Sequence, residues 1–237
     1  MLIVADVKSL EVVCAAHLSQ DEVLCREVID KTDFHDLNQK RFALPSRTTA
    51  KIFMFKLIYG ATAWGYANDG DFTSVSTREA FWQGVIDEFY NKYKEIGRWH
   101  TKIVQTAIET GLYESPTGRT YRYPPKDIVA RGWYWKPKIL NFPVQGLGAD
   151  LVMLARISFF NRINKYGIKC LPVSSVHDSI VVDSTEDLCY TVGKTLKESV
   201  EAVPLNFKRM FGVEFSLPLS AEIKVGKDLK NMERIEC

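Results

Sequence analysis

The chain has 237 residues, of which 46% are hydrophobic and 25% are charged, and its formal net charge is +2. These values are those of an ordinary globular protein with one large domain or two small ones, and they neither demand nor exclude nucleic acid. No apolar run is long enough to cross a membrane. The five cysteines contain no C-x-x-C, which argues against a cysteine zinc site and predicts a reduced, cytoplasmic setting.

The N-terminus predicts a buried strand followed by a helix. Residues 1–5 are apolar and rich in branched side chains, and the segment SLEVVCAAHLS carries apolar residues at helical spacing. Asp6 stands between the two. A carboxylate at the end of a buried strand is costly unless it has a partner, and a divalent cation is one such partner. A capping aspartate is the alternative.

Residues 31–45 predict a polar connection, in which His35 taken alone is more typical of a surface residue. Pro45 and Ser46 then predict a stop and a cap before a helix over residues 47–60, RTTAKIFMFKLIYG. On that helix one face carries two cations and then two aromatic rings, Arg47, Lys51, Phe55 and Tyr59. This order suits a nucleoside triphosphate, because Arg and Lys bind phosphate and a ring stacks on a base. Solvated cations and core rings are the alternative.

The middle of the chain predicts packing helices and then a hairpin. Residues 61–76 are rich in turn formers, and residues 77–110 show the amphipathic pattern of one or two helices. The segment YESPTGRTYRYPP predicts a hairpin with its turn at residues 116–118. Basic and aromatic residues alternate over residues 111–138, Arg119 among them, which is typical of a nucleic-acid surface; a solvated loop is the alternative.

The C-terminal region adds a helix, a hairpin and a tail. Residues 141–163 predict a helix with a proline near its start, on which Asn141 and Gln145 share a face suited to minor-groove base edges, or are ordinary polar residues. The segment CLPVSSVHDSIVVD predicts a buried hairpin with His177 and Asp178 at its tip, a placement that packing does not explain. A helix over residues 186 to about 211 and a closing strand follow.

These motifs resemble, in order and over essentially the whole chain, those of the family A (polymerase I-like) DNA polymerases. ADVKSLEVVCAAHLS is similar to motif A, R-x3-K-x3-F-x3-YG to motif B, and VHDSIVVD to motif C, which usually reads V-H-D-E. DFHD, GLYESPTGRTYRYP and N-x3-QG-x3-D resemble further family segments. The resemblance implies an α+β fold, with an antiparallel palm sheet and packed helices from residues 1–32 and 136–237, helical fingers from residues 33–135, and no thumb or exonuclease domain.

The resemblance also implies a role for individual residues. Asp6, Asp178 and the backbone carbonyl of Val7 would bind two Mg²⁺ ions, with Mn²⁺ as a substitute. Lys51 would act in catalysis as the proton donor to the leaving pyrophosphate. The other implied contacts are to the nucleotide, from Arg47, Lys51, Phe55, Tyr59, Glu11 and His35, and to DNA, from Asn141, Gln145, His177 and Arg119.

The implied reaction is template-directed transfer of a nucleotide from a deoxynucleoside triphosphate to a primer 3′-hydroxyl. Two positions depart from the family pattern: Ser179 replaces the usual acid after Asp178, and Pro137 stands where many members carry Arg. The chain starts within motif A, so we expect a fragment or one part of a split phage polymerase, acting in a bacterial or phage-infected cytoplasm.

We expect three kinds of partner: primer-template DNA, deoxynucleoside triphosphates and a polypeptide carrying thumb and exonuclease, with no membrane. We expect the partner polypeptide because the first strand would leave an exposed sheet edge and unburied apolar surface. One rival is a non-catalytic nucleic-acid-binding subunit that keeps the fold, which Ser179 favours. A metal-dependent phosphohydrolase explains the two aspartates but leaves the face from Arg47 to Tyr59 unexplained.

Overall fold

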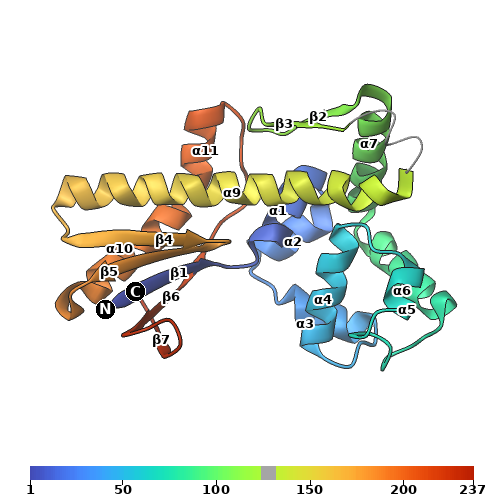
Figure 1. Ribbon diagram of the computed structural model, residues 1–237, viewed down its shortest axis with the longest axis horizontal. Helices are drawn as coiled ribbons and strands as arrows, with labels where there is room; N and C mark the ends of the chain where they lie inside the picture. The colour runs from blue at the N-terminus through green and yellow to red at the C-terminus, as the bar shows by residue number, and fades with distance from the viewer. Residues whose placement is uncertain (124–131) are drawn as a thin grey trace. The chain divides into compact units, whose positions relative to one another are not determined.

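The computed structural model describes residues 1–123 and 132–237, the side chains of residues 132–135 excepted (Figure 1). The chain divides into two compact units. The first, which we call the sheet unit, contains Met1–Leu10, Pro116–Gly118 and Gly146–Cys237. The second, the helical unit, contains Glu11–Ser115 and Arg119–Gln145. Among the described helices, none is both long and apolar enough to cross a membrane.

The described part of the sheet unit is built on a five-stranded antiparallel sheet, in the order β4-β5-β1-β6-β7. Its strands are β1 Leu2–Val7, β4 Cys170–Val176, β5 Ser179–Ser184, β6 Ala221–Gly226 and β7 Met232–Ile235. Helix α10, Cys189–Glu201, packs against β1 and β6. It comes so close that a Cβ added at Gly193 would lie 2.9 Å from Ile223 Cγ2. The α+β class and the antiparallel sheet expected from the sequence are confirmed.

The first strand occupies the centre of the sheet, which corrects one expectation. β1 pairs with β5 on one side and with β6 on the other, and it extends through Asp6 to Val7. The edge strands of the described sheet are β4 and β7 instead, and on β4 Leu171 and Val173 keep 66% and 53% of their surface accessible. The hairpin of β4 and β5 is present as predicted, but its first strand is not buried. The unburied apolar surface therefore exists, on a different strand.

The described part of the helical unit contains most of the short helices. They are α1 Leu10–Ser19, α2 Glu22–Ile29, α3 Phe34–Arg41, α4 Arg47–Ile58, α5 Ala63–Ala67, α6 Glu79–Lys92 and α7 Lys94–Thr110. A small hairpin of β2, Leu112–Glu114, and β3, Thr120–Arg122, follows with the predicted turn. Helix α3 lies within the segment predicted as a connection. Its start is fixed by Asp33, whose carboxylate accepts from the Asp36 backbone N–H at 3.0 Å.

Aromatic rings form the centre of the helical unit. The predicted helix over the R-x3-K motif is α4, and Ser46 caps it by accepting from the Thr49 N–H at 3.0 Å. On its buried side Phe53 meets Tyr66 and Phe89 with ring centroids 4.9 and 6.3 Å apart. The Tyr66 hydroxyl also donates to the Phe53 carbonyl at 2.7 Å. This cluster fixes the rotation of α4 and so decides which residues it exposes.

The helices of the C-terminal region differ in length from the prediction. Helix α9 spans Gly132–Tyr166 and contains both Pro137 and Pro143, so it begins well before the predicted start. The tail helix expected over residues 186–211 is three elements: the 3₁₀ turn η1 Glu186–Leu188, α10, and α11 Val203–Phe211. Pro204 at the first turn of α11 explains the break, because proline is favoured there and disfavoured in a helix interior.

Candidate active-site residues

The sheet unit brings the two predicted aspartates to the same end of neighbouring strands. Asp6 of β1 lies opposite Ser179 of β5, and the Val7 N–H donates to the Asp178 carbonyl at 2.9 Å. Residues opposite each other in an antiparallel pair lie about 4.5–5.5 Å apart. Asp6 and Asp178 are both partly exposed. Two carboxylates from distant parts of the sequence thus become neighbours at an accessible end of the sheet.

This pair fits a hard divalent cation. Carboxylate and carbonyl oxygens are the ligands of Mg²⁺, which commonly binds through one or two carboxylates together with substrate phosphates. Among the described residues no group of three or more His, Cys, Asp and Glu side chains could hold a metal. Ser179 does not extend the set, because its hydroxyl donates to the Val176 carbonyl at 2.8 Å and closes the hairpin. The protein therefore offers a partial coordination shell.

His177 forms the tip of the same hairpin. It is exposed and has φ 53°, a left-handed conformation that is uncommon for residues other than glycine. Backbone strain of this kind costs about 1–3 kcal/mol and gathers at functional turns. The hairpin therefore exposes the imidazole next to Asp178 at a cost in stability.

In the helical unit, α4 presents the predicted face. Arg47 and Lys51 are exposed, whereas Phe55 and Tyr59 are partly buried. The Lys51 ammonium lies 5.6 Å from the centre of the Phe55 ring. Tyr59 caps the C-terminus of α4 rather than continuing it, and Gly60 follows with φ 83°. The two rings are therefore not ordinary core residues, and the order of cations and rings predicted from the sequence is present.

Arg47 has a partner that the sequence did not reveal. Its Nε donates to Asp33 Oδ2 at 2.9 Å, and both side chains are about half exposed. Burial alone would raise the pKa of Asp33, but the hydrogen bonds from Arg47 and from the Asp36 backbone lower it. The D-x-x-D spacing could have predicted the N-terminal cap at residues 33–36, but no local signal predicts the pair with Arg47.

His35 is buried, although the sequence taken alone suggested a surface residue. Its ring lies 4.5 Å from the Phe34 ring and 5.9 Å from the Phe55 ring, centre to centre. Burial, followed by the nearby Arg47 charge, lowers the pKa of His35 to about 4. In the described part of the chain its Nδ1 has no hydrogen-bond partner. At neutral pH this imidazole is uncharged, and its Nδ1 can form a hydrogen bond with a ligand.

Glu11, Tyr59 and Gln145 form a hydrogen-bonded cluster within the helical unit. The Tyr59 hydroxyl donates to Glu11 Oε1 at 3.2 Å, and Gln145 Nε2 lies 2.9 Å from that oxygen and 2.7 Å from the hydroxyl. Burial and the Glu11 charge raise the pKa of Tyr59, so the phenol stays protonated. Asn141 lies one turn before Gln145 on α9 and is partly buried. The cluster holds the Glu11 carboxylate in one orientation.

Arg119 directly follows the turn of the small hairpin, and its backbone N–H donates to Ser115 Oγ at 3.2 Å. Tyr113 and Tyr121, on the two strands of this hairpin, stack with ring centroids 6.2 Å apart. The rest of the predicted basic and aromatic stretch, over residues 124–135, lies outside the residues whose side chains are described. The structure therefore gathers the predicted site residues into two groups, one in each unit.

Comparison with known proteins places the fold. The family model for DNA polymerase family A matches residues 1–231. The thermostable DNA polymerase I of Thermus aquaticus is 28% identical over 241 residues, covering 96% of this chain and 27% of that protein. The chloroplastic/mitochondrial DNA polymerase I A of Arabidopsis thaliana is 30% identical over 173 residues, with 72% and 16% covered.

A solved structure agrees. The POL domain of Pol1 from M. smegmatis, in complex with DNA primer-template and dNTP, has a TM-score of 0.81 at 20% identity, covering 96% of this chain and 39% of that one. At this identity the likeness shows the fold alone. The chain spans about a quarter of the length of the thermostable polymerases it matches.

Proposed function

Because the chain belongs to DNA polymerase family A, we propose that it extends a DNA primer by template-directed transfer of nucleotides from deoxynucleoside triphosphates. The observation that carries the proposal is the pairing of Asp6 opposite Ser179, with the Val7 N–H on the Asp178 carbonyl. It supports a two-carboxylate centre of the kind that nucleotidyl transfer needs.

Asp6 and Asp178, with the backbone carbonyl of Val7, would hold two Mg²⁺ ions, or Mn²⁺ in their place. When bound, such ions stabilise the attacking and leaving oxygens of the displacement. The chain's own contribution is to fix the two carboxylates at one end of the central strand pair and to leave them accessible. His177, beside Asp178 at the hairpin tip, would lie near the primer end.

The helical unit would bind the triphosphate. Arg47 would leave Asp33 for phosphate oxygens at little cost, because the two side chains are 52% and 50% exposed and such a surface pair contributes about 0–1 kcal/mol. Lys51 would neutralise the phosphates and give a proton to the leaving pyrophosphate. His35, with a pKa of about 4, would donate a hydrogen bond as a neutral ring.

The base and the sugar would meet the other end of the same face. Phe55 and Tyr59 offer rings for the base, and Glu11 would exclude a 2′-hydroxyl from the sugar position. The hydrogen bonds from Tyr59 and Gln145 support this role, because they fix the position of the Glu11 carboxylate.

DNA would be bound by side chains that read the shape of a base pair and its backbone. Asn141 and Gln145 would contact minor-groove base edges, which present acceptors at similar places in every pair. Arg119 would contact the backbone. In this proposal residues 1–32 and 136–237 form the palm and residues 33–135 the fingers. Thumb and exonuclease functions would come from a partner polypeptide of a split enzyme.

Primer extension tests the proposal. The full chain is incubated with a primed template, Mg²⁺ and four deoxynucleotides, alongside Asp178→Ala and the matched control Asp183→Ala from the same hairpin. We expect template-dependent extension by the chain and by the control, and its loss in Asp178→Ala and on chelation of the metal. Extension unaffected by Asp178→Ala would contradict the assignment. Nucleotide hydrolysis without template dependence would favour a phosphohydrolase.

One observation favours a non-catalytic subunit as the second candidate: Ser179 occupies the position of the usual third acid, and its hydroxyl serves the turn. If the folded chain alone is inactive, co-expression with a polypeptide that carries a thumb separates the two functions. Restored extension would identify a split enzyme, and continued inactivity with retained DNA binding would identify the non-catalytic subunit.

A further inference from the structure

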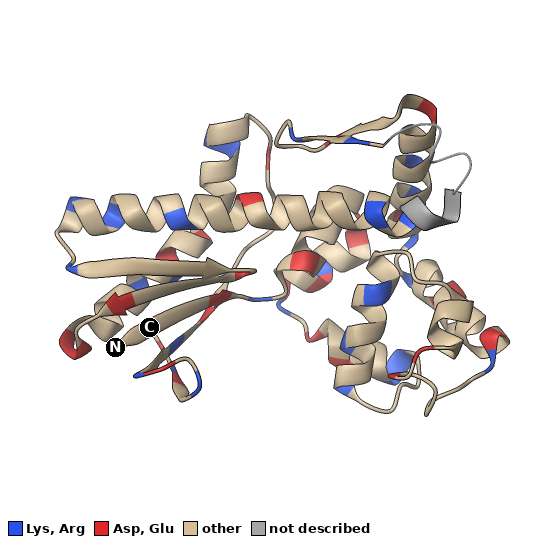
Figure 2. Cartoon of the chain, viewed as in Figure 1, with Lys and Arg blue, Asp and Glu red and all other residues tan. Residues whose placement is uncertain are grey.

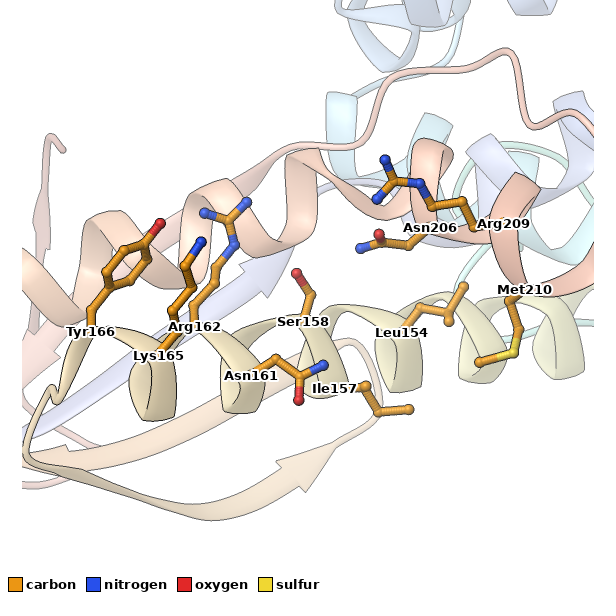
Figure 3. A pocket seen from close by; sticks show the side chains of 10 residues that line it. All are labelled: Leu154, Ile157, Ser158, Asn161, Arg162, Lys165, Tyr166, Asn206, Arg209 and Met210. Atoms are coloured by element: carbon orange, nitrogen blue, oxygen red, sulfur yellow. The ribbon is translucent and has the colours of Figure 1, made fainter.

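A groove of about 510 Å³ lies in the sheet unit between the C-terminal half of α9 and α11 (Figure 3). Its α9 side runs from Leu154 to Tyr166 at helical spacing, so one face of that helix forms the wall. Asn206, Arg209 and Met210 of α11 form the other side. We call this feature the α9–α11 groove. None of its residues belongs to the proposed active site or to the proposed DNA contacts.

Both walls of the α9–α11 groove carry cations. Arg162 and Lys165 of α9 and Arg209 of α11 line the groove, and no carboxylate does. Arg162 is partly neutralised from outside by Glu198 of α10, at 2.9 Å. Within the described part of the chain, Lys165 and Arg209 form no ion pair. Figure 2 shows basic residues along the C-terminal end of α9 and on α11. The groove thus has charge to offer an anionic ligand.

The groove also has apolar side chains that are incompletely covered. Ile157 and Met210 line it with 43% and 59% of their surface accessible. Met153 and Phe160 extend the same side of α9, at 44% and 54%. The spacing of residues 153, 157 and 160 places them in one stripe on the helix. A contiguous apolar surface of this kind marks a contact with another macromolecule.

The combination of cations and exposed apolar side chains identifies the class of ligand. A nucleic-acid backbone would use the three cations but would leave the aliphatic stripe facing water. A protein helix that carries both carboxylates and an apolar face would use both. From Leu154 to Tyr166 the wall of α9 extends about 18 Å, at about 1.5 Å per residue, which accommodates three to four turns of a helix.

We propose that the α9–α11 groove docks an acidic amphipathic helix of a partner polypeptide. Its carboxylates pair with Lys165, Arg209 and Arg162, and its apolar face covers Ile157 and Met210. Helix-in-groove recognition of this type obtains affinity from the apolar anchors, and the complementary charges fix orientation and partner choice.

A peptide selection tests this directly. A displayed library of helical peptides of about 14 residues is selected against the full chain, and the best binder is measured by fluorescence anisotropy. We expect selected peptides to be acidic and to carry apolar residues three and four apart. The double variant Lys165→Glu/Arg209→Glu should weaken binding on the order of tenfold or more, and Ile157→Ser on the order of tenfold.

Two matched variants separate a local effect from a loss of folding. Lys194→Glu reverses an exposed charge on α10, and Leu229→Ser removes an apolar side chain that is 64% exposed outside the groove. Both should bind the peptide like the unaltered chain, within about twofold. Circular dichroism melting of each variant checks that the sheet unit is intact.

Three results would overturn the proposal. The library could give binders without acidic bias, or none at all. Binding could survive the double charge reversal. A fluorescent single-stranded oligonucleotide of about 20 nucleotides could bind, and lose binding in the same double variant while peptides do not, which would make nucleic acid the occupant. Each of these outcomes is independent of primer extension, so the inference and the proposed function fail separately.

Discussion

A buried ion pair in the helical unit gives the sharpest test of the structure. Lys92 Nζ lies 2.8 Å from Glu27 Oε1, and the two side chains are only 10% and 12% exposed. The Tyr93 hydroxyl donates to Glu27 Oε2 at 2.7 Å, and Lys92 also donates to Asn38 Oδ1 at 2.9 Å. Burial and the Glu27 charge raise the pKa of Tyr93. The network ties α2, α3 and α6 together.

The predicted magnitude follows from this burial. Lys92→Gln leaves the Glu27 carboxylate buried without its cation, which costs about 3–5 kcal/mol of unfolding free energy. The matched change Lys40→Gln removes the pair with Asp36, where Nζ and Oδ2 are 3.5 Å apart and the side chains are 76% and 47% exposed. For such a pair we expect a loss of less than about 0.5 kcal/mol.

Urea unfolding followed by tryptophan fluorescence measures the stability of the helical unit, which contains both substituted residues. The five tryptophans fall between residues 64 and 135, all in the helical unit. With a urea slope of about 2–3 kcal/mol per molar, Lys92→Gln should lower the midpoint by about 1–2 M and Lys40→Gln by less than about 0.3 M. Equal shifts in the two variants would refute the reasoning, because desolvation would then not distinguish the pairs.

Three further predictions concern the helical unit. Because Phe55 has no hydroxyl to fill the sugar 3′ position, we expect the chain to discriminate against dideoxynucleotides and Phe55→Tyr to lose that discrimination in competitive primer extension; unchanged incorporation ratios in the variant would contradict this. Gly60→Ala should lower stability by about 1–2 kcal/mol or more, because φ is 83° and the new Cβ would lie 2.7 Å from Leu140 Cδ1; Gly70→Ala, with nothing within 4 Å, is the control. Burial lowers the pKa of His100 to about 3, so the unfolded state binds a proton at a higher pH than the folded state does. The urea concentration at the unfolding midpoint should therefore decrease as the pH is lowered from 6.5 to about 4. It should decrease less in His100→Gln.

Helices and hairpins that are specified by short sequence patterns could be predicted from the sequence. The α4 helix, its Ser46 cap and the hairpin around His177 follow from spacing and turn residues, and all are present. The one or two amphipathic helices predicted over residues 77–110 are the two helices α6 and α7. The start of α9 did not follow, because Pro137 and Pro143 normally mark the beginning of a helix and here lie inside one. Helix α3 was missed since its residues are mostly polar and only its cap identifies it.

Tertiary placement decides the parts of the candidate site that could not be foreseen. The sequence singled out Arg47, but its hydrogen bond to Asp33 depends on how α3 lies beside α4. His35 looked like a surface residue because a single histidine in a polar connection is usually exposed, whereas its ring lies against the rings of Phe34 and Phe55. The position of β1 between β5 and β6 likewise depends on partners that are distant along the chain.

The placement of Asp6 on β1 has a consequence for which genetic changes the chain can tolerate. Val4 and Ala5 are buried apolar side chains, and their replacement by apolar residues of similar volume would cost little stability. Loss or gain of a single codon before Asp6 is different. Successive side chains of a strand point to opposite faces, so such a change would turn the carboxylate towards the wrong side while leaving every chemical group in the protein. In this segment we expect insertions and deletions to be eliminated and substitutions to accumulate.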